Sequence, residues 1–484
     1  MSLRTILATA AAKAVLAACH LTGRPGSSLP GRAALKVDPQ IIASLAAQVR
    51  RGIIVTCGTN GKTTTNNLLC DMLEAQGFRV VSNRLGANMM EGVAAALATA
   101  ASPLATRPPG YRSAPASGGP LGYLDADFAC LEVDEASAAR VLQYLKPDYM
   151  IITGLFRDQL DRYGEIDLTM KALEKAIALA PDMTLVINGD DPLTAFLAQK
   201  SGHRFVAFGV SEQTTPEVDF PPAEAVSTPV STPNSSDEIR EGRFCENCGA
   251  PLHYDFYHFS QLGVYRCPSC GFKRPAIAYD AARVTMTPQL SFDVLEEDSA
   301  PIRISAPMTG FYNVYNILAV YGVLRELDLP TESINEVLRN YKPQFGRGEL
   351  FYLGRNREQK VLLNLAKNPT GFGQNIAAML QDRSPKDLII AINDNAQDGR
   401  DISWLWDVDF ERLADETVLS ITVSGLRALD MQLRLKYAEI ASTSAKTVEE
   451  AIERRLADGC GNLYVLVNYT ALYEAHKYLE GTAK

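Results

Sequence analysis

The sequence is poor in tryptophan and histidine and has no excess of basic residues. Its 484 residues include 2 Trp and 5 His, and 47 Lys and Arg stand against 56 Asp and Glu, which gives a formal net charge of -9. A phosphate backbone is bound by a basic face, so this balance counts against nucleic acid as a principal partner. Few histidines also leave few bases for activating a nucleophilic cysteine.

Long hydrophobic runs are lacking as well. No stretch approaches the roughly 18 continuous apolar residues of a membrane span. The segment ILATAAAKAVLAACHL is interrupted by Lys13, and the sequence after it resembles a folded loop more than a cleavage site. It is predicted to be an amphipathic first helix that packs on the core or rests on a membrane surface. We therefore expect a cytoplasmic protein, free or peripheral at the inner face of the plasma membrane.

A disulfide framework is also missing. Five of the nine cysteines are isolated in apolar surroundings, which fits a reducing compartment. None of them lies in a nucleophile-elbow context, so the chain is not expected to release ammonia from glutamine by itself. These isolated cysteines are Cys19, Cys57, Cys70, Cys130 and Cys460.

The other four cysteines form two pairs, CENC and CPSC, separated by residues 249–266. Two such pairs at this spacing predict a four-thiolate zinc site. Because four sulfurs complete a tetrahedral shell, the site is predicted to be structural, and His253 and His258 between the pairs are expected to be packing or surface residues. The predicted zinc ligands are Cys245, Cys248, Cys267 and Cys270.

Short β-rich runs alternate with helical patterns, which is typical of a parallel, doubly wound α/β sheet. A first series of such runs precedes residue 210 and a second follows residue 359, so two α/β units are predicted. Two stretches rich in proline, serine, alanine or threonine, 102–122 and 211–238, are expected to be surface insertions. A short segment, 342–349, is expected to be a hinge. The predicted strands are 51–57, 78–83, 128–134, 148–154, 183–189 and 204–209, then 360–366, 387–394, 418–425 and 463–469.

The motif GTNGKTT follows the first predicted strand and opens a helix. Backbone N–H groups and a helix N-terminus arranged in this way bind phosphate, and a lysine reaches the outer phosphates of a nucleotide. The strict phosphate-loop pattern has glycine where Thr56 stands, so the general template fits imperfectly. The residues predicted to contact the nucleotide are Gly58, Thr59, Asn60, Gly61, Lys62, Thr63 and Thr64.

An acidic cluster, CLEVDEAS, ends the strand predicted at 128–134. A carboxylate there can reach a magnesium ion that bridges ATP phosphates, with a phosphate-loop hydroxyl as a further ligand. The alternative is a solvated strand end. Next to the phosphate loop the first interpretation is favoured, and the predicted magnesium ligands are Thr63, Glu132 and Glu135.

These motifs resemble those of the Mur ligases and folylpolyglutamate synthetases, which convert a carboxylate to an acyl phosphate with ATP before an amine attacks it. RDQLDRYGEID has Gln159 where a histidine is common, and INGDDP, GFYNVYNILAV and FGRGE follow in the family's order. The resemblance implies that Asn313, Asn316 and Arg347 lie near the nucleotide. It leaves open whether Lys171 or Lys175 is the modified lysine found in many members.

The cysteine ribbon and two C-terminal motifs, LNLAKNPTGFGQNI and INDNAQDGRDISWLWDVDFE, narrow the resemblance to the family of MurT subunits of lipid II isoglutaminyl synthase. That resemblance covers nearly the whole chain. It implies a Mur ligase-like α/β fold with an N-terminal segment (1–45), a central ATP-binding domain with a parallel sheet (46–342) carrying an inserted zinc ribbon (243–274), and a Rossmann-like C-terminal domain (343–484).

The same resemblance implies ATP-dependent amidation of the α-carboxylate of D-glutamate in the lipid II stem peptide, within peptidoglycan and cell wall synthesis. Ammonia would come from a GatD-type glutaminase partner, with Mg²⁺ and structural Zn²⁺ as cofactors and membrane contact only through the lipid-linked substrate. Phosphate held near Lys62 would move to the carboxylate and leave when ammonia attacks. Lys367 and Asn368 stand where Mur ligases carry residues near the acyl phosphate.

Three aspartates, Asp394, Asp398 and Asp401, crowd a predicted loop after the strand at 387–394, the edge where open α/β sheets place their sites. The resemblance implies that one of them orients the partner's catalytic histidine or guides ammonia, and Asp394 and Asp398 are favoured equally. A polar turn with local side-chain hydrogen bonds is the alternative. Trp404 and Trp406, which follow, suit an interface or a core.

Two other functions remain open. One is a stand-alone ligase of the Mur or folylpolyglutamate type that adds an amino acid, although no signature of an amino-acid pocket is visible. The other is a regulatory nucleotide-binding module whose ribbon recruits a protein or nucleic acid. The low isoelectric point, near 5.3, counts against the second.

Overall fold

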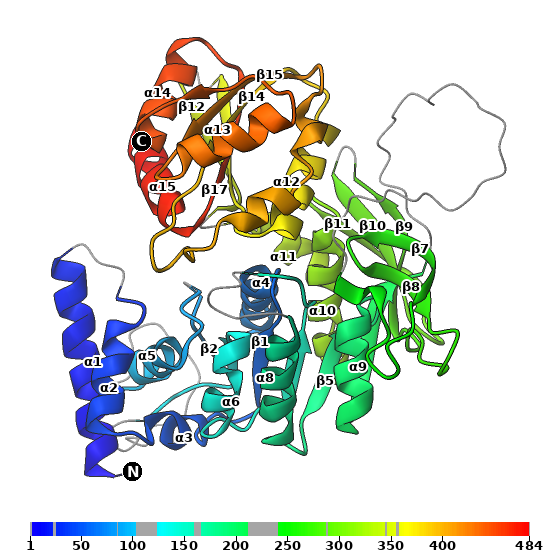
Figure 1. Ribbon diagram of the computed structural model, residues 1–484. Helices are drawn as coiled ribbons and strands as arrows, with labels where there is room; N and C mark the ends of the chain where they lie inside the picture. Colours follow the sequence, from blue (N-terminus) through cyan, green and yellow to red (C-terminus); the bar gives the residue numbers. More distant parts are fainter. Residues whose placement is uncertain are drawn as a thin grey trace.

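The computed structural model describes residues 2–22, 26–84, 86–102, 123–158, 166–211, 241–286, 289–343, 346–354 and 358–483. Gln159 and nearly all of the insertions predicted at 102–122 and 211–238 lie outside these ranges. Figure 1 shows two sheet-containing units, one above the other, with the N-terminal helices at one side of the lower unit.

The lower unit contains a nine-stranded sheet of order β11-β10-β9-β6-β5-β4-β1-β3-β2. All six strands predicted before residue 210 are confirmed as parallel neighbours, and β9 continues the parallel part. The sheet is mixed, however, because β10 runs antiparallel to both β9 and β11. The strands are β1 (Gly52–Cys57), β2 (Val80–Ser82), β3 (Phe128–Glu132), β4 (Tyr149–Ile152), β5 (Thr184–Asn188), β6 (Phe205–Val210), β9 (Tyr279–Thr285), β10 (Leu290–Leu295) and β11 (Ile302–Ala306).

The antiparallel edge escaped prediction because its sequence does not have the continuous apolar run of a buried parallel strand. In β10 a buried aspartate, Asp293, interrupts the apolar residues and forms ion pairs with Arg283 and Arg303. Side chains from the two neighbouring strands thus compensate the buried charge.

Helices cover both faces of this sheet. Successive residues of β1 point to opposite faces: Ile53 and Val55 join one core cluster, and Ile54 joins the other. One face carries α4 (Lys62–Ala75), α10 (Tyr312–Glu326) and α11 (Ile334–Asn340). The other carries α1 (Leu3–Leu21), α2 (Leu29–Val37), α3 (Ile41–Ala46), α5 (Met90–Ala100), α6 (Glu135–Leu142), α8 (Ile166–Ala178) and α9 (Pro192–Ser201).

A small hairpin is inserted between β6 and β9. Its strands, β7 (His253–Phe259) and β8 (Leu262–Arg266), follow the short turn η1 (Glu241–Arg243). The hairpin forms its own two-stranded sheet. The two cysteine pairs lie at its open end, and its turn points back toward the central sheet through a hydrogen bond from Gln261 Nε2 to the Leu155 carbonyl oxygen.

The upper unit has a six-stranded sheet of order β12-β13-β17-β14-β15-β16, parallel apart from β12. The four strands predicted after residue 359 are confirmed as β13, β14, β15 and β17. Helices lie on both faces, as the doubly wound pattern predicts. The elements are β12 (Arg347–Leu353), β13 (Gln359–Leu365), α12 (Pro369–Gln381), β14 (Lys386–Ala391), η2 (Ser403–Asp407), η3 (Phe410–Leu413), β15 (Val418–Ser424), α13 (Ala428–Tyr437), β16 (Thr443–Ser444), α14 (Val448–Ala457), β17 (Asn462–Val467) and α15 (Tyr469–Thr482).

Candidate functional site

The predicted phosphate loop joins β1 to α4. Gly58 and Gly61 have φ angles of 118° and 85°, which side-chain-bearing residues rarely adopt. A Cβ on Gly61 would also lie 2.3 Å from Asn316 Oδ1, so only glycine allows the loop to pass this close to α10. The loop therefore presents its backbone at the N-terminus of α4, where anions are stabilised by free N–H groups and the helix dipole.

Lys62 and Glu135 form a buried ion pair at the base of this loop. Lys62 Nζ lies 2.8 Å from Glu135 Oε1, and it also donates to the carbonyl oxygens of Gly58 and Thr59. The Glu135 carboxylate accepts a second hydrogen bond, 2.8 Å long, from the Gly58 N–H. Burial favours the neutral forms, but the Lys62 charge outweighs burial and lowers the pKa of Glu135, while the Lys62 pKa is raised in turn. Both groups are charged at neutral pH.

Thr63 lies at the centre of a second polar contact. Its hydroxyl donates to Glu132 Oε2 at 2.8 Å and accepts from Arg347 Nη2 at 2.8 Å. Asn88 Nδ2 donates to the other Glu132 oxygen at 3.0 Å. The structure thus brings together Thr63 and Glu132 as predicted, whereas the Glu135 carboxylate is occupied by Lys62 and the Gly58 N–H.

The two units meet at the loop. Asn368 Nδ2 donates to Asn60 Oδ1 at 3.1 Å, and the Lys367 ammonium pairs with Asp158. Burial opposes the charge on Lys367, but Asp158 outweighs it and raises the Lys367 pKa. Arg347, which donates to Thr63, is the third predicted residue of the upper unit that lies beside the phosphate loop, together with Lys367 and Asn368.

That cleft encloses about 1030 Å³ of space, which includes solvent at its open side. Its polar residues come from the phosphate loop, β3 and the upper unit, and its apolar wall from the hairpin and α10. Phe259 and Leu262 of the hairpin and Tyr312 of α10 were not predicted, because aliphatic and aromatic residues in a strand or helix are more often core. The lining residues include Thr59, Asn60, Gly61, Lys62, Thr63, Thr64, Glu132, Phe156, Phe259, Leu262, Tyr312, Tyr315, Asn316, Arg347, Lys367, Gln374 and Tyr469.

The start of α10 borders the loop, as predicted. Asn316 Oδ1 accepts from the Thr65 hydroxyl at 3.2 Å, and Asn316 Nδ2 donates to Asn313 Oδ1 at 2.9 Å. Asn313 in turn donates to the Thr309 carbonyl oxygen. Asn316 lines the cleft, and the hydrogen bond to Asn313 fixes the orientation of the Asn316 side chain.

The two candidates for a modified lysine lie elsewhere. Lys171 and Lys175 are both exposed on α8, and neither is among the residues that line the cleft within the described part of the chain. Asp158 forms an ion pair with Lys367 of the upper unit.

The three aspartates after β14 have different surroundings. Asp398 is buried and accepts from the Thr470 N–H at 2.9 Å and from the Thr470 hydroxyl, so it caps the N-terminus of α15. Asp394 is partly exposed and forms an ion pair with Arg427 at 2.5 Å. Asp401 accepts from the Ser403 N–H in a local turn. Of the two favoured residues, Asp394 is the one whose carboxylate reaches the surface.

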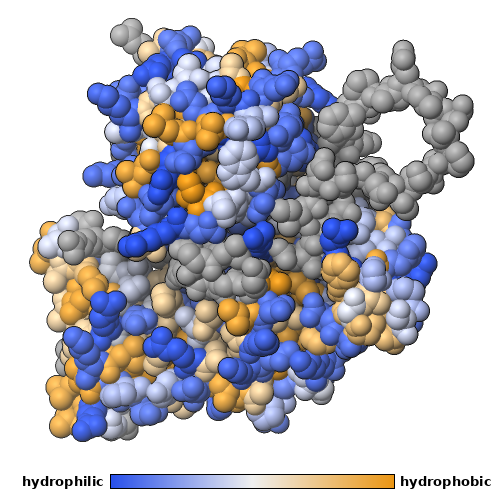
Figure 2. Space-filling model, in the orientation of Figure 1, coloured by the Kyte–Doolittle hydropathy of each residue, from blue (hydrophilic) through white to orange (hydrophobic). Residues whose placement is uncertain are grey.

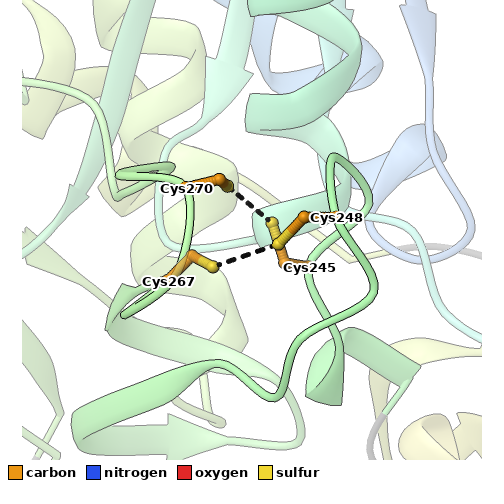
Figure 3. Close-up of side chains that lie close together, drawn as sticks. All are labelled: Cys245, Cys248, Cys267 and Cys270. Carbon is orange, nitrogen blue, oxygen red and sulfur yellow. Dashed lines mark hydrogen bonds between the residues drawn. The ribbon is translucent and has the colours of Figure 1, made fainter.

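The four paired cysteines converge at the open end of the hairpin. Figure 3 shows their side chains directed toward one another from two knuckles, and the sulfurs of Cys245 and Cys270, and of Cys248 and Cys267, are 3.5 Å apart. All four sulfurs lie within 4.8 Å of one another. Gly249 follows the first pair with a φ of 73°, which allows a tight return of the backbone. This donor set fits a tetrahedral metal ion.

The two histidines between the cysteine pairs have different surroundings. His258 is buried, contacts the rings of Phe311 and Tyr315, and lies 2.8 Å from the Val210 carbonyl oxygen. His253 is half exposed on the hairpin and pairs with Asp255. The prediction of packing and surface positions agrees with these surroundings.

Comparison with known proteins agrees with this geometry. The family model described as Mur ligase middle domain matches residues 55–234, and the model described as MurT ligase C-terminal matches residues 365–472. Among solved structures, a pseudomurein peptide ligase type C from Methanothermus fervidus superposes with a TM-score of 0.62 at 20% identity, covering 92% of this chain and 81% of that one. MurF from Acinetobacter baumannii superposes with a TM-score of 0.61 at 15% identity, covering 92% of this chain and 80% of MurF.

Fold and loop together define an ATP-dependent ligase of the Mur type. Among curated relatives, the lipid II isoglutaminyl synthase (glutamine-hydrolyzing) subunit MurT of Staphylococcus aureus is 35% identical over 464 residues, covering 95% of this chain and 94% of the relative. The subunit of the same name from Streptococcus pneumoniae is 32% identical over 483 residues, which cover 99% of this chain and 98% of the relative. The chain belongs to the MurT family.

Proposed function

We propose that this chain is the synthetase subunit that amidates the α-carboxylate of D-glutamate in the stem peptide of lipid II, in peptidoglycan synthesis. The observation that carries the proposal is that residues of the MurT-specific C-terminal motifs contact the phosphate loop at one cleft.

We also propose a division of the chain into an N-terminal segment (1–45), a central domain (46–342) and a C-terminal domain (343–484). The end of the nine-stranded sheet at Ala306 and the start of the six-stranded sheet at Arg347 support it.

The cleft residues suit activation of a carboxylate by ATP. The loop N–H groups and Lys62 stabilise charge on the transferred phosphoryl group, while Arg347 adds a second cation beside Thr63. Lys367 and Asn368 approach from the opposite side and suit the acyl phosphate oxygens. Because these groups come from both units, closure of the units assembles the site and excludes water from the acyl phosphate.

Magnesium fits the contact between Thr63 and Glu132. Both offer oxygen ligands, which Mg²⁺ prefers, and the hydroxyl and carboxylate oxygens are already within 2.8 Å of each other. Bound there, the ion would neutralise charge on the phosphates. Asn88 and Arg347 orient the two ligands, and Glu135 serves to hold Lys62.

Zinc fits the cluster of four cysteines, and its removal is expected to weaken nucleotide binding. The hairpin that the cluster closes also contributes Phe259 and Leu262 to the cleft. We expect Cys267→Ser to lose bound zinc, measured by elemental analysis, and to bind ATP roughly three- to tenfold more weakly by calorimetry, because an aromatic contact contributes about 0.5–1.5 kcal/mol. Cys460→Ser, in the upper unit, is the matched control. Retention of zinc and of full ATP affinity by Cys267→Ser would contradict the assignment.

Ammonia is proposed to come from a GatD-type glutaminase subunit. The relatives' name describes a glutamine-hydrolysing synthase of which MurT is one subunit. The five isolated cysteines of this chain are all buried, which does not suit a nucleophile that must reach glutamine.

An exposed apolar stripe beside Asp394 suits the docking of this partner. Its residues recur at helical spacing along and just before α13, and Trp406 extends the stripe by packing edge-on against Tyr437 at 5.3 Å. Figure 2 shows apolar side chains on this face of the upper unit. Arg427, which pairs with Asp394, lies within the same segment. The stripe consists of Leu426, Leu429, Leu433 and Tyr437.

The proposed function is tested with the purified chain, ATP, Mg²⁺, lipid II and a high concentration of ammonium salt, without glutaminase. We expect mass spectrometry to show a product in which one hydroxyl is replaced by an amino group. A product heavier by an amino-acid residue, formed only when amino acids are supplied, would identify a conventional ligase. No product, even with the glutaminase added, would refute the amidation.

A further inference from the structure

The first helix, α1, turns three leucines outward. A surface helix usually directs leucines to the core and polar residues to solvent. In α1 the buried positions are Thr5, Ala8, Thr9, Ala12 and Cys19. Leu3, Leu7 and Leu21 are instead 72%, 53% and 90% exposed.

These leucines belong to one continuous face. The exposed apolar positions follow one another at intervals of three or four residues, which places them on a single side of the helix. Figure 2 shows apolar surface along the edge where α1 runs in Figure 1. The residues of this outer face are Leu3, Leu7, Ala10, Ala14, Ala17, Ala18 and Leu21.

The N-terminal segment that carries this face is basic, in a protein that is acidic overall. The first 50 residues contain six lysines and arginines and a single acidic residue, Asp38, against a net charge of -9 for the whole chain. Asp38 is buried and accepts a hydrogen bond from the Thr5 hydroxyl at 2.8 Å. Arg4, Arg32 and Lys36 are exposed. No acidic side chain in the described part of α1 and α2 opposes an anionic surface.

We propose that α1 and α2 form a peripheral docking element for an anionic lipid surface. The outer face of α1 inserts its leucines at the boundary of headgroups and acyl chains, and Arg4, Arg32 and Lys36 contact the headgroups. By length and composition, with a mean hydropathy of 1.2, α1 could also cross a membrane. Its contacts with α2 and α5 and the basic Arg4 and Lys13 favour an orientation along the surface.

The docking element is connected to the cleft through α5 and the residues that precede it. A Cβ on Gly31 of α2 would lie 1.8 Å from the Glu91 carbonyl oxygen, so α2 touches the first turn of α5. Two residues before α5, Asn88 donates to Glu132 of the site. A chain held at the membrane by α1 and α2 would therefore meet a lipid-linked substrate from the α5 side of the cleft. This last consequence rests on the proposed function, whereas lipid binding itself does not.

The test is flotation of the full chain with vesicles of phosphatidylglycerol or phosphatidylcholine that contain no lipid II. We expect the chain to bind the anionic vesicles, and we expect this binding to weaken with salt. Leu7→Glu/Leu21→Glu should bind at least tenfold more weakly. In Arg32→Gln/Lys36→Gln, the affinity should fall roughly fivefold for each basic residue replaced. Leu419→Glu, an equally exposed leucine on β15, is the matched control. Thermal unfolding checks that each variant is folded.

Several outcomes would overturn the inference. Equal binding by Leu7→Glu/Leu21→Glu and the unmodified chain would do so, as would binding only when the vesicles contain lipid II. Resistance to carbonate extraction would make α1 a membrane span, and loss of the glutaminase complex without loss of lipid binding would make the face a protein interface. The expected result, by contrast, is that the same variants amidate a soluble precursor at the normal rate and amidate lipid II in vesicles more slowly, which separates the docking element from the chemistry.

Discussion

Replacement of Lys62 by alanine is expected to lower the rate of ATP-dependent amidation by roughly 10²- to 10³-fold, the effect of removing one group that stabilises transition-state charge. The same change should also destabilise the fold. Lys62 and Glu135 have side chains only 8% and 7% exposed, and loss of one partner leaves the other charged and buried. Breaking such a pair costs about 3–5 kcal/mol. Steady-state kinetics and chemical denaturation measure the two effects separately.

The double variant Lys62→Met/Glu135→Gln separates catalysis from stability. It removes both charges, so the free energy of unfolding should recover most of what Lys62→Ala loses, while the amidation rate stays low. Lys200→Ala, which removes an exposed lysine paired with Glu174, is the control for loss of a surface charge. Recovery of activity in the double variant would mean that Lys62 acts only through folding.

Asp394→Asn is expected to abolish most glutamine-dependent amidation and to spare the ammonium-dependent reaction. If Asp394 orients the partner's catalytic histidine, its loss should slow glutamine hydrolysis by roughly 10²- to 10⁴-fold, as for other bases that lose an orienting carboxylate. The ATP cleft is untouched, so free ammonium still serves as the nucleophile. The measurement is the ratio of the two rates, with glutamine or with ammonium salt, in the assembled complex.

Asp398→Ala is the matched comparison. Because Asp398 caps α15, we expect a loss of about 0.5–2 kcal/mol in unfolding free energy and no selective effect on the glutamine-dependent amidation rate. If Asp398→Ala, and not Asp394→Asn, lost only the glutamine-dependent reaction, Asp398 would be the residue that acts on the glutaminase and Asp394 would have a structural role.

Leu429→Glu, on the apolar stripe, should weaken assembly with the glutaminase. When the glutaminase concentration is limiting, only the glutamine-dependent rate should fall.

The strands and the polar motifs were predictable because their signals are local. The run 51–57 followed by glycines and Lys62 specifies a strand, a loop and a helix within a few residues, and the cysteine spacing specifies one cluster. The Mur-type fold and the family followed from motifs of this kind, and both are confirmed.

Pairings between distant residues could not be predicted in the same way. Glu135 was predicted to bind magnesium because it closes an acidic strand end, yet its carboxylate lies against Lys62, 73 residues earlier in the chain. Phe259 and Leu262 enter the cleft only because the hairpin folds back onto the central sheet. The choice between Asp394 and Asp398 depended on Thr470, which belongs to the last helix.

The hairpin has a thermodynamic consequence of its own. Its open end holds the four cysteines, and its turn supplies Phe259 and Leu262 to the cleft, so in the proposed function one small element would hold zinc at one end and border the nucleotide at the other. Binding free energies are reciprocal: whatever zinc adds to the affinity for ATP, ATP adds to the affinity for zinc. A supply of nucleotide would then slow the loss of zinc to a chelator, and metal starvation would reduce amidation of the cell wall before the protein unfolds.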